Sequence, residues 1–170
     1  PNIMSLFNLK NKVYAVTGAS GALAGTAARY LAQSGARVAF ISRSQCKLDA
    51  AVKDLGPEVA TFPCDVTDRE ALEKTFALIL ERFGRIDGLI NGAGGNMPGA
   101  TISPGATVFD LDFNDYEKVL ELNLSGTLLP SLVFGEYFAK CKQGVIVNFS
   151  SASSQQALTR VLGYSNAKAA

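Results

Sequence analysis

The chain has 170 residues, of which 48% are hydrophobic and 18% are charged, with 16 Lys and Arg against 15 Asp and Glu. This composition supports a packed core and excludes a disordered chain, and the length fits roughly one domain. A net charge of +1 gives no basic excess for nucleic acid or for an anionic membrane, so neither is expected as a partner. Histidine is absent, which excludes triads with a histidine base and histidine-ligated metal or haem sites within this chain, and we expect no metal.

The cysteines and the N-terminal segment indicate a cytoplasmic location. Cys46, Cys64 and Cys141 are far apart and odd in number, which predicts neither a disulfide framework nor a zinc site. We interpret them as small buried hydrophobic residues in a reducing setting. The N-terminal segment lacks the apolar core of a signal peptide, and no apolar stretch reaches the roughly 18 residues of a membrane span.

Five short apolar runs predict five β-strands that alternate with helical segments. The predicted strands are residues 13–16, 37–41, 58–62, 87–90 and 145–149. Continuous apolar runs are typical of strands that are buried on both faces. We therefore expect the α/β class, with a doubly wound parallel sheet and right-handed crossovers.

Two helices between these strands have recognisable ends. Ser44 is predicted to cap a helix that reaches about Leu55. Thr67 or Asp68 is predicted to cap another, which stops at Gly84.

The C-terminal end of the chain lies within a helix-forming run. The last helix is predicted to begin at Gly163, and no Gly or Pro stop follows before Ala170. We expect residues 1–170 to be a single domain whose C-terminal part is absent.

A long helix is predicted after the loop at residues 91–111, which is rich in Gly and Pro. Asn114 and Glu117, three residues apart, resemble a capping box. Asn123, a poor helix former, lies toward the apolar face, so we expect it to avoid solvent. Pro130 predicts a kink or break, and Gly144 the end of the helical region. The apolar face at period 3.6 is predicted to be Phe113, Tyr116, Leu120, Leu124 and Thr127.

A glycine-rich turn, TGASGALAG at residues 17–25, joins the first strand to the first helix. Such a turn presents backbone N–H groups and the positive end of a helix dipole to a phosphate, although an ordinary turn has the same composition. The second strand ends in Ser42 and Arg43, where a carboxylate would bind a ribose 2′-hydroxyl. A serine followed by a guanidinium favours a 2′-phosphate instead.

Two further segments lie where the carboxyl ends of strands are expected. The run NGAGG at residues 91–95 would let a ligand approach the sheet edge closely, or is simply a flexible loop. Tyr164 and Lys168, four residues apart, share one helix face, and an ammonium beside a phenol favours the phenolate. That pair provides a general acid or base, and the Ser151 hydroxyl could bind a substrate oxygen. Taken alone, such a pair usually consists of surface residues, and such a serine run is usually just a polar loop.

Taken in order along the chain, these motifs resemble the short-chain dehydrogenase/reductase family. The motifs are TGASGALAG, Asp65-Val66, NGAG, Asn123, Ser151 and Tyr164-Ser-Asn-Ala-Lys168, from about Leu9 onward. The spacing of thirteen between serine and tyrosine matches the family and selects Ser151 over Ser150. Residues 89–98, 109–112 and 122–130 further resemble the D-mannonate oxidoreductase (fructuronate reductase)-like branch.

The resemblance implies a Rossmann-like, NAD(P)(H)-dependent oxidoreductase that transfers a hydride between the nicotinamide and a carbonyl or alcohol, with a sugar acid as a candidate substrate. Ser42 and Arg43 add the expectation of NADP(H) rather than NAD(H). The family resemblance implies that Tyr164 is the acid/base, that Lys168 assists it and holds the nicotinamide ribose, and that Ser151 orients the substrate. It further implies that Asn123 helps to hold a relay water. The implied cofactor-binding residues are Gly18, Ser20, Gly21, Leu23, Ser42, Arg43, Asp65, Val66, Asn91, Gly92, Ala93, Tyr164 and Lys168.

The resemblance also implies a homodimer or homotetramer that forms through the helices around Asn123 and Tyr164. The chain departs from the family's glycine pattern at Ala22 and Ala24, and Ala24 adds a methyl where helix and strand pack closely. One alternative is a nucleotide-binding sensor or scaffold with no turnover. Another is a hydrolase with Ser151 as nucleophile and Lys168 as base, although no GxSxG motif is present.

Overall fold

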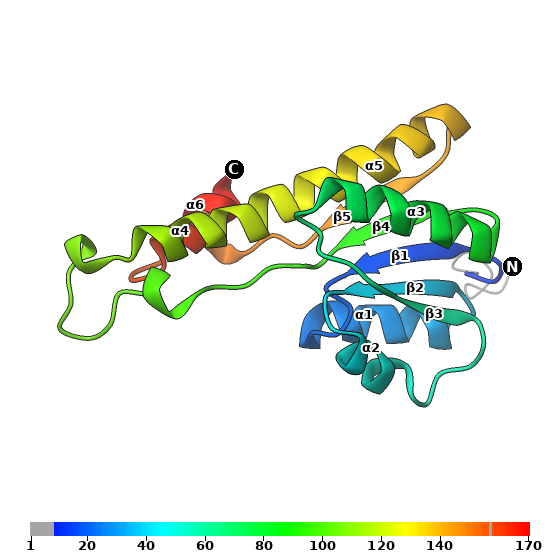
Figure 1. Ribbon diagram of the computed structural model, residues 1–170, viewed down its shortest axis with the longest axis horizontal. Coiled ribbons are helices and arrows are strands. Elements are labelled where there is room, and N and C mark those ends of the chain that lie inside the picture. The colour runs from blue at the N-terminus through cyan, green and yellow to red at the C-terminus, as the bar shows by residue number, and fades with distance from the viewer. Residues whose placement is uncertain (1–8, 157) are drawn as a thin grey trace, which may run out of the picture.

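The predicted parallel sheet is confirmed. The computed structural model describes residues 9–156 and 158–170. The strands are β1 (Val13–Thr17), β2 (Arg37–Ser42), β3 (Val59–Pro63), β4 (Gly88–Asn91) and β5 (Val145–Asn148). All pair in parallel, in the order β3-β2-β1-β4-β5 (Figure 1). The order reverses between β1 and β4, and ligands of such sheets bind beyond the carboxyl ends of the strands at this switch point.

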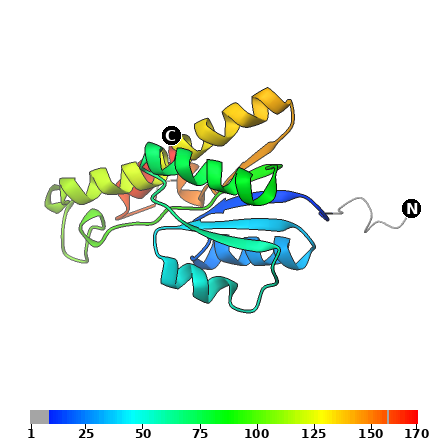
Figure 2. The ribbon, with the colours of Figure 1, turned by 45° about the vertical axis from the view of Figure 1, so that its right-hand side comes forward.

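Helices cover both faces of the sheet. The helices α1 (Ala22–Gln33) and α2 (Gln45–Val52) lie on one face, and α3 (Arg69–Phe83) and α5 (Gly126–Cys141) on the other (Figures 1 and 2). Each layer of helices packs on the sheet through its own apolar cluster. The cluster on the side of α1 and α2 includes Val38, Phe40 and Leu48, and the cluster on the side of α3 and α5 includes Leu89 and Phe134. The helices α4 (Phe113–Leu120) and α6 (Leu162–Ala169) extend beyond the carboxyl edge of the sheet.

Short turns complete the chain between these elements. They are 3-10 turns η2 (Pro98–Ala100), η3 (Val108–Asp110) and η5 (Ala152–Ser154), and a π-helical turn, η4 (Glu121–Ser125).

Sequence correctly predicted the caps of α2 and α3. The Ser44 hydroxyl accepts a hydrogen bond from the Lys47 N–H at 3.4 Å, and the Asp68 carboxylate accepts one from the Ala71 N–H at 3.0 Å. Gly84 ends α3 in the left-handed conformation, with φ of 75°. The side chains of Ser44 and Asp68 thus accept hydrogen bonds from backbone N–H groups that the start of a helix leaves unpaired.

The predicted capping box of the next helix is wrong. The helix α4 begins one residue before Asn114, so Asp112 is the cap, and its carboxylate accepts a hydrogen bond from the Asp115 N–H at 3.0 Å. Asp115 in turn accepts a hydrogen bond from the Gly99 N–H at 3.1 Å. The start of α4 therefore also anchors the loop that follows β4.

The predicted apolar face of the long helix is only partly correct, and the π turn η4 changes the helical repeat after Leu120. Phe113 is 64% exposed and Leu124 is 38% exposed, whereas Asn123 is buried, as expected. The helix runs unbroken through Pro130, so the irregularity lies one turn earlier than predicted. The helical region ends at Lys142, a left-handed residue with φ of 52°, rather than at Gly144.

Two expectations about burial are wrong in part. The strands β1 and β2 are largely buried, but β5 is exposed at all four residues, because it is a sheet edge that α5 covers on one face. Of the cysteines, Cys64 is buried, and Cys46 and Cys141 are exposed.

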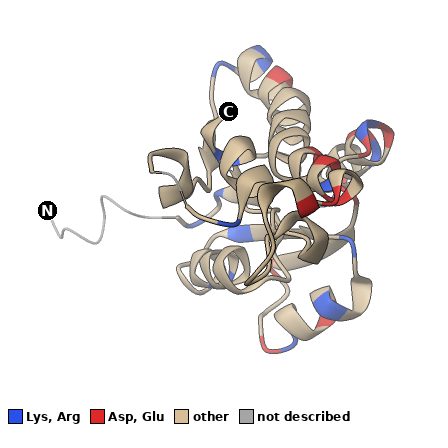
Figure 3. Ribbon diagram, turned by 90° about the vertical axis from the view of Figure 1, so that its left-hand side faces the viewer, with Lys and Arg blue, Asp and Glu red and all other residues tan. Residues whose placement is uncertain are grey.

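Charged residues of both signs are interspersed over the molecule in the view of Figure 3. In the described part of the chain, no helix is long and apolar enough to cross a membrane.

A cluster of ion pairs closes the amino-terminal end of the sheet, next to the starts of β1 and β4. The buried Asp87 carboxylate accepts hydrogen bonds from the Val13 N–H at 3.0 Å, from Lys12 at 3.3 Å and from Arg85. Burial alone would raise the pKa of Asp87, but the hydrogen bonds from Arg85, Val13 and Lys12 outweigh it, and the pKa is lowered. This carboxylate is therefore held ionised.

Candidate functional site

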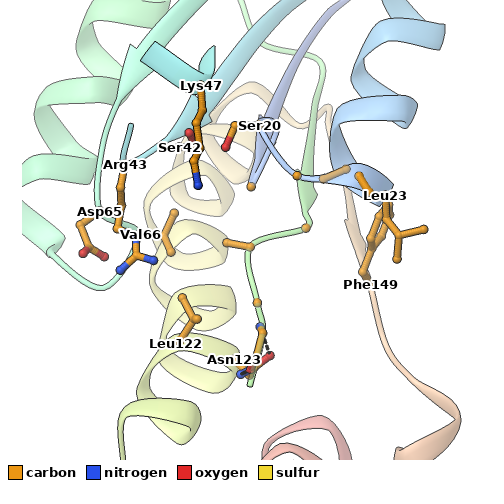
Figure 4. A pocket seen from close by; sticks show the side chains of 18 of the residues that line it. Ser20, Leu23, Ser42, Arg43, Lys47, Asp65, Val66, Leu122, Asn123 and Phe149 are labelled. Carbon is orange, nitrogen blue, oxygen red and sulfur yellow. Dashed lines mark hydrogen bonds between the residues drawn. The ribbon is translucent and has the colours of Figure 1, made fainter. Parts of the chain in front are cut away.

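A cavity of about 500 Å³ lies at the carboxyl edge of the sheet, at the switch point between β1 and β4. It gathers side chains and backbone from the turns after β1, β2, β3 and β4, together with η4 and α6 (Figure 4). Most of the predicted site residues line it. They are Gly18, Ser20, Gly21, Leu23, Ser42, Arg43, Asp65, Val66, Gly92, Ala93, Asn123, Tyr164 and Lys168.

The turn after β1 packs directly against the loop after β4. Gly18 has φ of +67°, and a Cβ there would lie 2.6 Å from the carbonyl oxygen of Gly92. The buried Thr17 hydroxyl accepts hydrogen bonds from the N–H groups of Gly92, at 3.1 Å, and Ala93, at 3.2 Å. Sequence reasoning missed Thr17, although a polar residue that ends a buried strand was a signal. Thr17 joins the two loops that form the centre of the cavity.

The additional methyl of Ala24 has a defined place in this junction. A Cβ on Gly92 would lie 2.5 Å from the Ala24 Cβ, so the Ala24 methyl fills the space that a side chain at position 92 would need. The departure from the family's glycine pattern is accommodated because residue 92 is glycine.

The end of β2 brings an unpaired hydroxyl and two cations to the cavity wall. The Ser42 Oγ is buried and has no hydrogen-bond partner among the described residues. Arg43 and Lys47 are both exposed, and neither side chain makes an ion pair or hydrogen bond within residues 9–156 and 158–170. Lys47, which sequence reasoning missed, extends beside Ser42 in Figure 4. The cap of Ser44 was the signal, since it places Lys47 in the first turn of α2.

The segment after β3 contributes Asp65 and Val66. One oxygen of the Asp65 carboxylate accepts hydrogen bonds from the Thr67 N–H, at 3.0 Å, and from the Thr67 hydroxyl, at 2.8 Å. These local bonds fix the turn that leads into α3. In Figure 4, Arg43 extends toward Asp65 and Val66, so the polar wall of the cavity continues from β2 to β3.

The π turn η4 directs Asn123 at the loop after β4. Asn123 donates to the Gly95 carbonyl at 2.6 Å and the Val119 carbonyl at 2.8 Å, and accepts from the Gly95 N–H at 3.1 Å. Both amide hydrogens are therefore used by the protein. A Cβ on Gly94 would lie 2.7 Å from the Asn123 Oδ1 and 3.6 Å from the Lys168 Nζ. Asn123 thus holds the glycine loop close to Lys168.

The helix α6 presents Tyr164 and Lys168 to the cavity, as predicted. The Lys168 Nζ donates to the Phe149 carbonyl at 2.8 Å and lies 5.8 Å from the centre of the Tyr164 ring. Burial lowers the pKa of Lys168. Tyr116 of α4 positions this helix, because its hydroxyl accepts a hydrogen bond from Asn166 at 3.1 Å.

Two predicted site residues do not line the cavity. Asn91 is buried behind it and donates to Asn148 and Ser131, both at 2.9 Å, which ties β4 to β5 and α5. Ser151 caps η5, and its hydroxyl accepts a hydrogen bond from the Ser153 N–H at 3.3 Å. Ser150, which the family spacing disfavoured, lines the cavity instead.

Comparisons with known proteins agree with this architecture. The family model for short chain dehydrogenase matches residues 12–170. An uncharacterized oxidoreductase of Bacillus subtilis (strain 168), UxuB, is 39% identical over 173 residues, which cover 95% of this chain and 62% of the relative.

Two crystal structures share the fold. A Haemophilus influenza protein provisionally called a D-mannonate oxidoreductase, with bound NAD, has a TM-score of 0.88 at 35% identity, and the match covers 99% of this chain and 65% of that one. A variant of actinorhodin polyketide ketoreductase with NADPH has a TM-score of 0.83 at 28% identity, over 93% of this chain and 60% of that one.

This chain thus spans less than two thirds of the length of these relatives. The sheet order and the turn after β1 make the fold Rossmann-like, as the resemblance implied. Together, the family match over residues 12–170 and the identity to the Bacillus relative establish that the chain belongs to the short-chain dehydrogenase family.

Proposed function

We propose that residues 1–170 form a single dinucleotide-binding and catalytic domain of an NADP(H)-dependent oxidoreductase. The observation that carries the proposal is that Tyr164 and Lys168 line the same cavity as the Gly18 to Gly21 turn. A turn suited to a pyrophosphate and an acid/base pair therefore share one site. The proposed reaction interconverts a carbonyl and an alcohol on a small molecule.

The residues present fit such a dinucleotide. Gly18 lets the turn after β1 pack closely against Gly92, the turn lines the cavity, and the N-terminus of α1 favours the negative charge of a pyrophosphate. Ser42 offers a buried hydroxyl without a described partner. When bound, the nicotinamide supplies or accepts the hydride. The protein supplies orientation, charge and the proton.

The proton is assigned to the Tyr164 hydroxyl, which gives it to a carbonyl oxygen in reduction and takes it back in oxidation. Lys168 places its ammonium beside that ring and is itself held by the Phe149 carbonyl. Asn123 acts as a positioning residue, because its bonds to Gly95 hold the loop next to Lys168. Ser151, with Ser150 as its alternative, orients the substrate oxygen from the loop after β5.

Three features of this chain favour NADP(H) over NAD(H), whereas the related structures bind one or the other. No carboxylate stands at the end of β2, where it would bind a 2′-hydroxyl and repel a 2′-phosphate. Arg43 provides a fork of donors, and Lys47 a second positive charge beside the same wall. Neither cation forms an ion pair with a described side chain, and Arg43, Lys47 and Lys168 outnumber the one carboxylate of the described cavity lining, Asp65, so a phosphate would meet a net positive charge.

For substrate and assembly, we propose a sugar acid and a cytoplasmic homodimer or homotetramer. The similarity to the Haemophilus protein supports the substrate class. An exposed apolar stripe on η4 and α5 supports the assembly, since Leu124, Leu128 and Leu132 recur every four residues at exposures of 38%, 52% and 50%. This stripe extends from the segment around Asn123 that the family resemblance assigned to subunit contact.

The proposal is tested by Tyr164→Phe in the intact protein, with NADPH oxidation measured over a panel of carbonyl compounds. We expect kcat to fall by about 10²- to 10⁴-fold, because the ring remains and only the transferable proton is lost. NADPH binding, measured by fluorescence titration, should be unchanged. The control is Tyr30→Phe, since Tyr30 lies 70% exposed on α1. A wild-type protein that binds NADPH but reduces no carbonyl would support the sensor or scaffold alternative.

A further inference from the structure

A second cavity, of about 450 Å³, lies between η5 with its following loop, α6, and the loop between β4 and α4. It adjoins the first site along the chain: Ser153 follows the η5 cap Ser151, and Ser165 follows Tyr164. Tyr164 itself does not line it. The apolar part of its wall is made by Ile102, Val108, Leu158 and Leu162.

Two hydroxyls in this cavity lack hydrogen-bond partners. Ser153 is 5% exposed, and its Oγ has no partner among the described residues. The Oγ of Ser165, on α6, is likewise buried and unpaired. Buried polar groups are nearly always hydrogen-bonded, so two such hydroxyls on residues that line one cavity indicate a polar partner, which each serine would reach by rotation about χ1. Hydroxyl groups of a ligand could both donate to and accept from them.

The cavity also carries an uncompensated positive charge. Arg160 is the charged residue of its described lining, and no Asp or Glu accompanies it. Its side chain makes no ion pair or hydrogen bond within the described ranges. Its backbone is in the left-handed region, with φ of 70°, and its carbonyl accepts a hydrogen bond from the Ile102 N–H at 2.9 Å. Such a conformation persists only where the surroundings impose it, and it often accompanies a functional position.

From these observations, we propose that Arg160 binds the carboxylate of a hydroxylated acid, with the hydroxyls of Ser153 and Ser165 directed at hydroxyl groups of the same molecule. A guanidinium matches a carboxylate through two parallel hydrogen bonds. The inference rests on the proposed function, and it names the residue that selects an acid over the corresponding neutral sugar. Loop residue Ile102 holds Arg160 in place, so the segment after β4 takes part in this selection.

The test compares two substrates of the intact protein that differ in the carboxylate: a keto-aldonate and the neutral ketose of the same chain length. For Arg160→Gln, we expect the KM of the acid to rise about 10- to 100-fold, as for loss of a charge-assisted contact, with kcat/KM for the ketose unchanged. Arg160→Lys should retain part of the preference. Arg69→Gln is the matched control, since Arg69 lies on the exposed side of α3 and pairs with Glu73.

A binding measurement separates this inference from the proposed function. Gluconate is titrated calorimetrically into the wild-type protein and Arg160→Gln with NADPH present, and the unfolding temperature verifies that each variant is folded. Binding that Arg160→Gln abolishes would support the inference even if no compound were reduced, which would refute only the oxidoreductase activity. Absence of gluconate binding to the wild type, or equal losses for the acid and the ketose in Arg160→Gln, would overturn the inference.

Discussion

Both ends of the sheet carry a lysine and an arginine, but in the described part of the chain only one end pairs these cations with a carboxylate. At the amino-terminal end, Lys12 and Arg85 converge on the buried Asp87 carboxylate, which also accepts the Val13 N–H. At the carboxyl end, Arg43 and Lys47 line a cavity with no such partner among the described residues.

This difference separates stability from binding. The ion pairs around Asp87 fix where β1 and β4 begin. Because these charges are paired with one another, they are not available to a ligand. Cations without a protein partner add little to the stability of the fold, and their positive potential remains available to an anion. Changes at one end are therefore expected to leave the other end unaffected.

The largest effect is expected at the carboxyl end, from Arg43→Ala combined with Lys47→Ala. We expect the Kd for NADPH to rise about 100-fold, the low end for two charge-assisted contacts because both side chains are exposed. The Kd for NADH and the unfolding temperature should change little. Fluorescence titration of both cofactors measures this, and equal losses for NADH and NADPH would show that the cations do not contact a 2′-phosphate.

A substitution of Ser42, in the same wall of the cavity as Arg43 and Lys47, should reverse the preference for NADPH over NADH. Ser42→Asp puts a carboxylate where a 2′-hydroxyl would be bound, so we expect the ratio of kcat/KM to shift from NADPH toward NADH. A wild-type protein that already uses NADH as well as NADPH would contradict the cofactor proposal.

At the amino-terminal end, Asp87→Asn should lower the free energy of unfolding by about 2 kcal/mol, because charge-assisted hydrogen bonds to a buried carboxylate are lost. Urea denaturation measures this, and the Kd for NADPH should stay constant. The pH dependence has a defined sign. The folded pKa of Asp87 lies below its ordinary value of 3.8, so the stabilisation is present above that pH and is lost as pH falls through the folded pKa. Asp87→Asn should lack this acid-dependent part.

An effect of similar size should appear where the first turn of α1 meets the loop after β4. Gly92→Ala should destabilise the protein by about 2 kcal/mol, since the new Cβ overlaps the Ala24 methyl. Ala24→Gly should recover about 1 kcal/mol of that loss in the double variant, but not all of it, because the Thr17 carbonyl oxygen also lies 3.0 Å from the new Cβ. A double-mutant cycle by thermal denaturation measures the coupling, and strict additivity would contradict the shared-space explanation.

The smallest effect is expected from an ion pair that belongs to neither end. Arg69 and Glu73 form a surface pair on α3 at 2.8 Å, with side-chain exposures of 63% and 53%. Replacing both with Gln should leave the denaturation midpoint and cofactor binding within experimental error.

Sequence patterns best predicted the parts of the site that follow β1 and β2. The apolar runs, the Gly18 turn and the Ser44 cap are local signals, and each was confirmed. Patterns were less useful where the structure depends on distant contacts. Nothing local distinguishes Asn91, whose amide links three elements, from a residue that faces a ligand.

The serine loop shows the same limit. Spacing within the family selected Ser151, but the loop conformation puts Ser150 in the first cavity and uses the Ser151 hydroxyl as a cap. Burial of β5 was also mispredicted, because an apolar sequence does not reveal that a strand lies at an edge. The role of each side chain here follows from tertiary contacts that no periodicity encodes.

The π turn η4 has a consequence for the rotational phase of the long helix. At about 100° per residue, an uninterrupted α-helix would put Phe138 roughly 100° around the axis from Val119, yet both are buried. A π turn accommodates one additional residue and restores the shared phase. Deleting one residue from 121–125 would therefore leave a continuous helix but rotate α4, together with the α6 packed on it, relative to the sheet. The angular position of Tyr164 at the carboxyl edge is thus set by a residue count in a neighbouring helix.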